Sequence, residues 1–364
     1  MRHTALVAIL LFCLLALAGC TGGQDNTPRA VQFYLEEDGT PFTKGAASVV
    51  LEPTAVFPEG ERQDTLWVAA VSREMRTGDV PTKGIPYNAT EGFPTEGTLG
   101  LMAYTYATHG ADTTSWTLYT ASNDSRTVCY VPEASRWIPA PDLFYPTEEG
   151  YIRFFAFGPK DAQVTGVSAR DHAGPALSYT APADLAAQRG LLVAAPDQRP
   201  CPPGLLEMGV PLDLQHVLSG VRFAVSNRLK LVSVSVSGVY DQGVYYVVRG
   251  RWNTLGKSVT TPSWPISISN YAEDMVAGTA AFDCVAPRFT LLMIPQRLPT
   301  GATVSVRVQK EDLSYLNYNI DVGGQLWEKG KLTQYVIADI KMYFGINVND
   351  YPSFDPLDWG DEEE

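Results

Sequence analysis

The sequence predicts an all-β protein in which two tandem antiparallel β-sandwich domains follow a lipoprotein signal peptide. Three observations support this fold class. Many short runs of β-branched and aromatic residues are separated by turn signals, and no long stretch has convincing helical periodicity. A break between Pro196 and Pro203 holds four prolines in eight residues, and no central strand can pass through it because proline lacks a backbone N–H. We therefore expect two sandwiches that meet at this break.

The composition is that of a globular protein. A chain of 364 residues is long enough for two domains of ordinary size. Its formal net charge of −13 argues against nucleic acid or an anionic lipid surface as a partner, since both would repel it. The sequence implies no cofactor.

The amino terminus carries an export signal. Fourteen uninterrupted apolar residues, Ala5 to Ala18, would span only about 21 Å as a helix, too short for a membrane core of ~30 Å. The run ends in Leu17-Ala18-Gly19-Cys20, the pattern of a bacterial lipobox. We expect residues 1–19 to be a signal peptide cleaved between Gly19 and Cys20, and Cys20 to carry the lipid. The alternative is an ordinary cleaved signal with a stray cysteine.

Three further cysteines, Cys129, Cys201 and Cys284, remain in the exported chain. An oxidising compartment permits one disulfide among them, with Cys201 and Cys284 as the candidate pair, and leaves one thiol over. The equally weighted alternative is that all three are small buried apolar residues.

The first domain is expected to span residues 31–198, after a polar tether at residues 20–30. Its predicted strands are rich in β-branched and aromatic residues. They include Val31–Leu35, Ser48–Leu51, Trp67–Val71, Leu99–Tyr106, Trp116–Tyr119, Val128–Val131 and Tyr151–Phe157. The aromatic residues are expected to build the sandwich core more often than a sugar platform.

A proline-rich linker at residues 199–209 leads into the second domain, residues 210–350. There Val232, Val234 and Val236 alternate with serines, the pattern of a strand with one buried and one wet face. Leu212 to Ser219 fits either a short helix or a strand. Residues 351–364 form an acidic tail, which we interpret as solvated, with calcium binding as the lesser alternative.

No catalytic or metal-binding motif is apparent, so the sequence does not predict an enzyme. The mature chain has three histidines, His109, His172 and His216, and none has metal-ligand spacing. A catalytic Ser-His-Asp triad can assemble from distant segments, so the sequence leaves that alternative open. No glycine-rich phosphate loop or nucleophile elbow occurs.

The chain resembles the fimbrillin family, the lipoprotein subunits of type V pili. Around the proline-rich break, one segment of the family pattern is matched by Tyr179, Pro182, Gln188, Leu191, Leu192 and Ala194. The segment that opens the second half is matched by Val210, Pro211, Leu212, His216, Leu218, Ser219, Val221 and Phe223. Further matches are Trp137, Phe144–Pro159, Gly238–Gly243, Phe289–Pro299 and Trp327–Ile337, with one departure at Tyr145, where the family often has tryptophan before the proline.

The resemblance implies two transthyretin-like sandwiches and a mechanism of assembly. In this family a protease cuts the lipoprotein after a basic residue and removes an amino-terminal strand, and a strand from a neighbouring subunit fills the groove. The available basic residues are Arg29, Lys44, Arg62, Arg73 and Arg76. We favour Arg62, because Pro58 to Gln63 reads as an exposed loop between two apolar runs. The donor strand is expected around Lys341 to Val348, although Pro352, Pro356 and the acidic end make a poor strand.

The implied partners are other fimbrial subunits, the outer membrane through the lipid anchor, and a ligand on a host or bacterial surface. The subunit could serve as a stalk, an anchor or an accessory component. The alternative function is a monomeric surface lipoprotein that binds glycan through exposed tryptophan and tyrosine.

Overall fold

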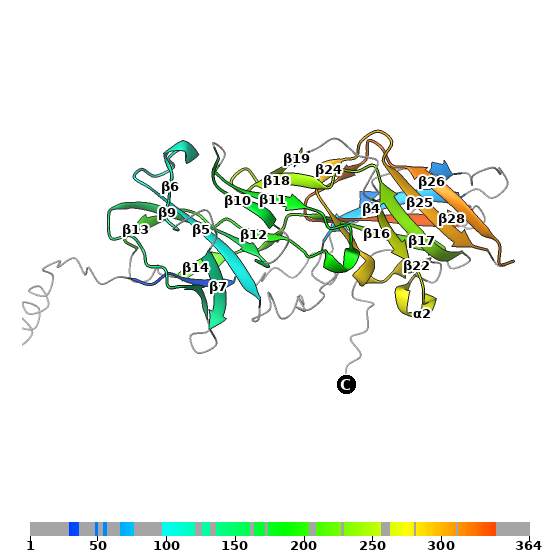
Figure 1. Ribbon diagram of the computed structural model, residues 1–364, viewed down its shortest axis with the longest axis horizontal. Helices are drawn as coiled ribbons and strands as arrows, with labels where there is room; N and C mark the ends of the chain where they lie inside the picture. Colours follow the sequence, from blue (N-terminus) through cyan, green and yellow to red (C-terminus); the bar gives the residue numbers. More distant parts are fainter. Residues whose placement is uncertain are drawn as a thin grey trace, which may run out of the picture.

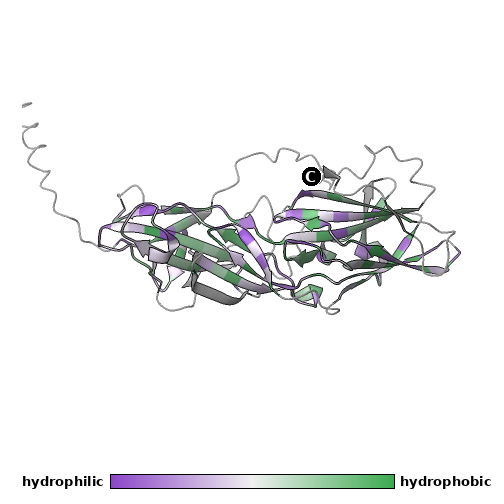
Figure 2. Ribbon diagram, turned by 90° about the horizontal axis from the view of Figure 1, so that it is seen from above, coloured by the Kyte–Doolittle hydropathy of each residue, from purple (hydrophilic) through white to green (hydrophobic). Residues whose placement is uncertain are grey.

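The computed structural model describes residues 29–35, 48–49, 54–56, 66–75, 97–120, 126–131, 136–160, 164–171, 174–203, 209–226, 229–255, 263–279, 282–310 and 312–339. Nearly all regular structure in these ranges is β-strand, which confirms the all-β prediction. The strands lie in two lobes along the long axis, with hydrophobic residues spread along the strands of both (Figures 1 and 2). The helical segments are short: α2 (Tyr271–Asp274) and the 3-10 turns η2 (Thr113–Ser115), η4 (Leu185–Ala187) and η5 (Pro287–Phe289).

A ten-stranded sheet forms the first lobe, in the order β14-β1-β8-β7-β5-β9-β12-β15, with β13 beside β9 and β6 beside β5. Its strands are β1 (Gln32–Leu35), β5 (Thr98–Tyr106), β6 (Thr117–Leu118), β7 (Arg126–Val131), β8 (Arg136–Ala140), β9 (Gly150–Gly158), β12 (Leu192–Ala194), β13 (Arg199–Cys201), β14 (Gly209–Leu212) and β15 (Gln215–His216).

Both faces of this sheet are buried, as β9 shows. Successive side chains of a strand point to opposite faces. Phe154 and Ala156 belong to one hydrophobic cluster, whereas Phe155 and Phe157 belong to the main core on the other side. This explains why β9 reads as a continuous apolar run rather than an alternating one.

A four-stranded sheet, β10-β11-β18-β19, joins the two halves of the chain. Its strands are β10 (Val164–Asp171), β11 (Gly174–Thr180), β18 (Gln242–Tyr246) and β19 (Arg251–Leu255). Leu177 of β11 lies opposite Tyr245 of β18, and both residues are buried in the same core cluster as Phe155. The sheet therefore combines a hairpin from before the proline-rich break with one from after it.

The second lobe is a sandwich of two sheets. The larger has the order β2-β4-β28-β16-β22-β21, with β3 beside β4 and β23 beside β16; the smaller has the order β20-β17-β25-β26. The larger sheet comprises β2 (Ser48–Val49), β3 (Thr54–Val56), β4 (Leu66–Glu74), β16 (Ser219–Ser226), β21 (Met275–Thr279), β22 (Phe282–Val285), β23 (Leu291–Met293) and β28 (Lys331–Asp339). The smaller comprises β17 (Lys230–Ser237), β20 (Trp264–Ser267), β25 (Thr303–Gln309) and β26 (Tyr315–Asp321), and a separate pair is formed by β24 (Gln296–Arg297) and β27 (Leu326–Trp327).

The alternation predicted for β17 is interrupted once. Val234 and Val236 are buried as expected, but Val232 is only half-buried. A shift in the register with β25 between Leu231 and Ser233 marks a bulge. The bulge moves Leu231 into the core in place of Val232, because an extra residue reverses the facing of the side chains beyond it.

Strands cross the expected domain boundaries in both directions. β4 precedes every long strand of the first lobe, yet pairs along its full length with β28 in the second. β14 follows the proline-rich segment, yet pairs with β1 in the first lobe. The division into domains at residues 31–198 and 210–350 stays a prediction. Each lobe contains at least one strand from the other side of that division.

Two pairings are parallel, whereas the sequence predicts antiparallel sandwiches. β1 runs parallel to β14, and β16 runs parallel to β28. Each pair joins one end of the described chain to its middle. The ambiguous stretch from Leu212 to Ser219 is extended: it closes β14, forms β15 opposite Leu192 and opens β16.

Candidate functional site

The candidate site is the place that β1 occupies in the first sheet. β1 has β14 on one side and β8 on the other, so it is an inserted strand and not an edge. It pairs with all four residues of β14, from Gln32 opposite Gly209 to Leu35 opposite Leu212. On the other side the register places Phe33 opposite Trp137. We call the space between β8 and β14 the β1 slot.

Two side chains of this segment fill holes in the core. Val31 and Phe33 are both fully buried, and they lie on the same face because they are two residues apart. The Phe33 ring packs edge-on against Phe154, with the ring centroids 5.3 Å apart. Their cluster also includes Leu143, Tyr145, Val210 and Leu212. The slot therefore recognises an extended segment by a pair of apolar side chains at alternate positions.

Backbone and side-chain hydrogen bonds hold the start of the segment. The Val31 N–H donates to the Leu143 carbonyl at 2.7 Å, and the Tyr145 N–H donates to the Arg29 carbonyl at 2.8 Å. The Arg29 guanidinium donates to the Pro203 carbonyl. These contacts extend the ladder beyond β1 itself, and they are made with the loop after β8 and with the proline-rich segment.

The side chains around the Phe33 position are mostly apolar and buried. Burial raises the pKa of the Tyr145 hydroxyl to about 12 and that of the Cys201 thiol to about 11, so both stay neutral at physiological pH. Cys201 belongs to the same cluster as Phe33. An apolar strand fits this environment better than a charged one.

A second amino-terminal contact lies in the other lobe. β2 and β3 both run antiparallel to β4: Ser48 pairs with Ser72, and Thr54 pairs with Val68. Together they cover the side of β4 that faces away from β28. β1, β2 and β3 all precede residue 57, so one stretch of chain contributes strands to the main sheets of both lobes.

The structure places two of the predicted cleavage residues. Arg29 lies before β1, so a cut there would leave β1 in its slot. Arg73 lies inside β4, opposite Leu332 of β28, in a ladder that β2 flanks on the other side. Arg62, Arg76, Lys44, the lipobox residues Gly19 and Cys20, and the donor segment 341–348 lie outside the described residues.

The predicted disulfide is not formed. Cys129, Cys201 and Cys284 are all free thiols in the described structure, and Cys201 and Cys284 belong to different hydrophobic clusters. Cys201 lies in β13 of the first sheet and Cys284 in β22 of the second lobe. The alternative interpretation, small buried residues, describes both of these positions.

Sequence reasoning missed the partner strand β14. Val210, Pro211 and Leu212 were assigned to the second domain because they follow the proline-rich break. The apolar alternation of Val210 and Leu212 was a usable signal for a strand, but only the fold assigns it to β1. His216 lies in β15, half-buried.

Among the described residues, no group of acidic, histidine or cysteine side chains is placed to hold a metal ion, and no helix is long and apolar enough to cross a membrane.

Comparison with known proteins decides the family. A model of fimbrillin-like proteins matches residues 89–338, which is more than half of the chain. The chain belongs to the fimbrillin-like family.

A search of solved structures finds fimbrial proteins of low sequence identity, with TM-scores below 0.5. A fimbrial protein from Bacteroides vulgatus is 14% identical, with 66% of this chain and 87% of that chain covered and a TM-score of 0.45. The fimbrial anchor protein Mfa2 from Porphyromonas gingivalis is 11% identical, with 82% and 83% covered and a TM-score of 0.30. No functionally curated protein matches the chain by sequence.

Several fimbrillin motif residues have structural roles in this chain. The buried Gln188 donates to the Pro182 carbonyl at 3.0 Å and accepts the Leu292 N–H at 2.7 Å. Gln296 accepts the Tyr240 N–H and donates back to the Tyr240 carbonyl. Both amides join segments that are far apart in the sequence: Gln188 does so across the proline-rich break, and Gln296 within the second half of the chain.

The aromatic residues mostly build the core, as predicted. Among the described tryptophans with placed side chains, Trp116, Trp137, Trp264 and Trp327 are buried and Trp252 is half-buried. The exposed aromatic side chains of the described chain include Phe144 and Tyr315. Among these residues, Trp252 is therefore the tryptophan whose side chain is accessible to a glycan.

Proposed function

We propose that this fimbrillin-like protein is a subunit of a surface pilus, exported as a lipoprotein anchored at Cys20 and assembled by strand exchange after proteolysis. The family establishes the coarser statement, a fimbrial or adhesion protein of the cell surface. The anchor, the cut and the exchange are our inference.

One observation carries the proposal: β1 is a short strand inserted between two others, and Phe33 within it and Val31 just before it are both fully buried. Its covalent link to the rest of the molecule runs through residues 36–65. After one cut in that link, only non-covalent contacts would hold β1. Departure of β1 would leave unpaired backbone groups on β8 and β14 and two apolar holes, which an extended segment of another subunit can satisfy.

Cleavage after Arg62 fits this scheme better than the other basic residues. It frees β1, β2 and β3 together and leaves β4 whole, so the nine register pairs between β4 and β28 persist. A cut after Arg73 would sever β4. A residue inside a paired strand is also a poor protease substrate, because its backbone is held by the neighbouring strands and cannot enter the protease groove. A cut after Arg29 would release no strand.

The donor segment is proposed to be Lys341 to Val348 of a neighbouring subunit. That sequence has an apolar side chain at every second position: Met342, Phe344, Ile346 and Val348. In an extended strand these side chains all face the same way, as a slot with pockets at alternate positions requires. Burying an apolar side chain of this size contributes about 1.5–3 kcal/mol. A contact between the carboxyl end of one copy and the slot of the next is heterologous, so it builds an open filament.

The test uses the lipid-free mature chain from Thr21 to Glu364. It is treated with an Arg-specific protease, then followed by mass, amino-terminal sequencing and a denaturing gel run without boiling. We expect one early cut, a new amino terminus at Gln63, and a ladder of resistant oligomers. A new terminus elsewhere would overturn the choice of Arg62, and a clean cut with no ladder would overturn strand exchange by this subunit.

Two controls sharpen this experiment. Arg62→Gln should abolish both the cut and the ladder, whereas Arg29→Gln should leave both intact. A chain that ends at residue 339 should be cut normally but should form no ladder, because it lacks the donor. Ladder formation by that chain would show that the donor lies elsewhere.

A further inference from the structure

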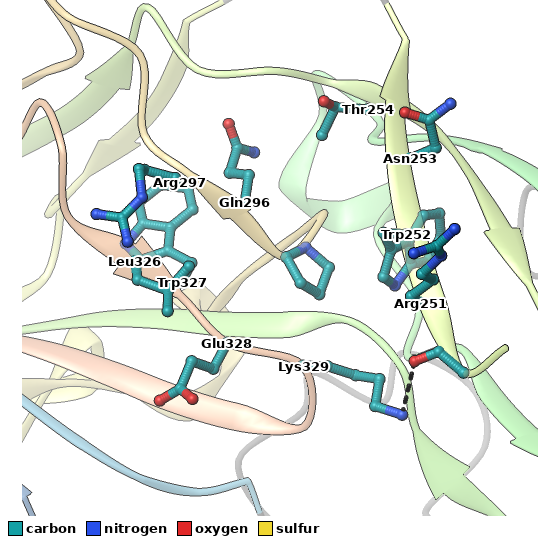
Figure 3. Close-up of a pocket in the computed structure, with 12 residues that line it drawn as sticks. Arg251, Trp252, Asn253, Thr254, Gln296, Arg297, Leu326, Trp327, Glu328 and Lys329 are labelled. Carbon is teal, nitrogen blue, oxygen red and sulfur yellow. Dashed lines mark hydrogen bonds between the residues drawn. The ribbon is translucent and has the colours of Figure 1, made fainter.

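A pocket at the junction of the two halves offers a second binding site. It lies between one end of β19 and the β24–β27 pair and has a volume of about 600 Å³ (Figure 3). Its walls are Gly250–Thr254, Pro295–Arg297 and 326–329. The site lies outside the β1 slot, so the inference does not depend on strand exchange.

The charge of the pocket is opposite to that of the chain. Arg251, Arg297 and Lys329 line it, and the Arg251 side chain makes no hydrogen bond or ion pair with the described residues. The one acidic wall residue, Glu328, is already paired: the Lys331 ammonium donates to its carboxylate at 2.7 Å. Three cations therefore remain to attract an anion, in a chain with a net charge of −13.

Two of these cations are held in position before any ligand arrives. The Lys329 ammonium donates to the Gly250 carbonyl at 3.1 Å, as the dashed line in Figure 3 marks. The Arg297 guanidinium donates to the Gly324 carbonyl at 2.8 Å. Each bond uses only part of the donor capacity of its side chain, so further donors remain for a ligand. Less side-chain entropy is lost on binding when the donors are fixed in advance.

The remaining wall is apolar. The indole N–H of Trp252 donates to the Val217 carbonyl at 2.6 Å, which fixes the ring and leaves only its carbon surface for a ligand. Pro295 and the exposed Leu326 also line the pocket and add further apolar surface. A ligand for this pocket needs an apolar face, polar groups around its edge and a negative charge.

We infer that the pocket binds a saccharide that carries an acidic group, a carboxylate or a sulfate. The C–H face of a sugar ring suits the Trp252 and Pro295 surface, its hydroxyls suit the polar rim, and its anion suits the three cations. A volume of about 600 Å³ lies in the range of pockets that enclose one small ligand. An acidic peptide would place most of its length outside, because the walls come from three stretches of three to five residues.

The experiment measures binding of single sugars to the full mature chain by ligand-observed NMR. The probes are glucuronic acid and galactose 6-sulfate, each compared with its neutral parent, glucose or galactose. We expect the acidic sugars to bind at least tenfold more tightly than the neutral ones, and more weakly in 500 mM than in 50 mM salt. The two acidic probes distinguish a carboxylate ligand from a sulfate ligand. Equal binding of acidic and neutral sugars, or no binding of any, would overturn the inference.

Variants assign the binding to this pocket. Arg251→Gln combined with Lys329→Gln should weaken binding at least fivefold, and Lys329→Gln alone should weaken it less. The control is Arg307→Gln, which removes an exposed cation of β25 that lies over the Tyr315 ring of β26, and it should leave binding unchanged. Thermal unfolding checks that each variant is folded. Unchanged binding in the folded double variant, or pocket-dependent binding of a peptide of residues 351–364 without any sugar binding, would contradict the inference.

Discussion

Gln188 joins the two halves of the chain through a single buried side chain. It is buried, and its amide joins the turn after β11 to the Leu292 N–H of β23. Both partners are backbone groups and the Gln188 side chain is buried, so the amide satisfies hydrogen-bonding groups of two distant segments at once. The glutamine in the family motif is thus explained by hydrogen bonding within the protein, and no ligand is needed.

We expect Gln188→Leu to lower the free energy of unfolding by about 2–4 kcal/mol, because it leaves a buried N–H and a buried carbonyl unpaired. Chemical denaturation followed by intrinsic fluorescence measures the change. The matched control is Gln242→Leu at an exposed position of β18, which should change stability by no more than about 0.5 kcal/mol. Equal effects of the two substitutions would contradict the role given to Gln188.

Asp274 provides a pH-dependent contribution at the residue scale. Its burial alone would raise the pKa of the carboxyl, but the N–H groups of Asn270 and Ser269 and the Arg288 guanidinium outweigh burial and hold the pKa below its ordinary value. A carboxyl with a lowered pKa in the folded state stabilises the protein above its unfolded pKa, near 4, and this contribution is lost as the pH falls through the folded pKa.

We therefore expect the melting temperature of the wild type to fall below about pH 4 more steeply than that of Asp274→Asn, which has no charge to lose. The measurement is a series of thermal scans between pH 3 and pH 6. At pH 6 the variant should be the less stable protein. Parallel pH profiles for the two proteins would show that Asp274 contributes nothing to acid sensitivity.

At the scale of the element, β1 and β4 differ in how firmly they are held. β1 pairs along four residues with β14 and at one position with β8, whereas β4 pairs along nine residues with β28 and also with β2 and β3. Backbone ladders add up along a strand, so β1 is the more readily exchanged of the two. This difference follows from pairing alone and does not require the family mechanism.

The β1 slot should bind its own strand when the strand is supplied separately. We expect a chain that starts at Gln63 to bind a synthetic peptide of residues 28–36, measured by fluorescence anisotropy. The same peptide with Phe33→Ala should bind at least thirtyfold more weakly, equivalent to about 2 kcal/mol, because it leaves the Phe33 hole empty. A peptide with Gln32→Ala is the control, since Gln32 is only half-buried. Similar affinities for all three peptides would contradict the slot.

At the scale of the whole molecule, one core unites the two halves. The largest hydrophobic cluster contains Phe155 and Tyr104 from the first sheet, Tyr245 from the joining sheet, and Phe223 and Trp264 from the second lobe. β4 and β14 also cross between the lobes, so neither half has all of its strands without the other.

This interlacing predicts a single cooperative thermal transition in calorimetry, although the chain is long enough for two independent domains. Gln188→Leu should shift the whole transition rather than split it. Two separated transitions in the wild type would show that each lobe folds alone. The proposed cut after Arg62 should lower the transition temperature, because it frees strands of both lobes.

The sequence by itself determined the all-β class, several of the longer strands and the family. Local patterns report directly on strands: β5 and β9 are dense in apolar and aromatic residues, and valine alternates with serine in β17. Motif residues such as Gln188 and Gln296 identified the family through their order and spacing. The sequence also showed that no familiar catalytic motif was present.

The tertiary structure alone decided which strands are partners. Neither the parallel pairing of β1 with β14 nor the place of β4 in the second lobe can be inferred from local patterns, because strands pair through backbone groups that every residue shares. The same reason separates Cys201 from Cys284 and brings Arg251, Arg297 and Lys329 to one pocket. Contacts between distant segments depend on the packing of the entire chain, and this packing positions both proposed sites.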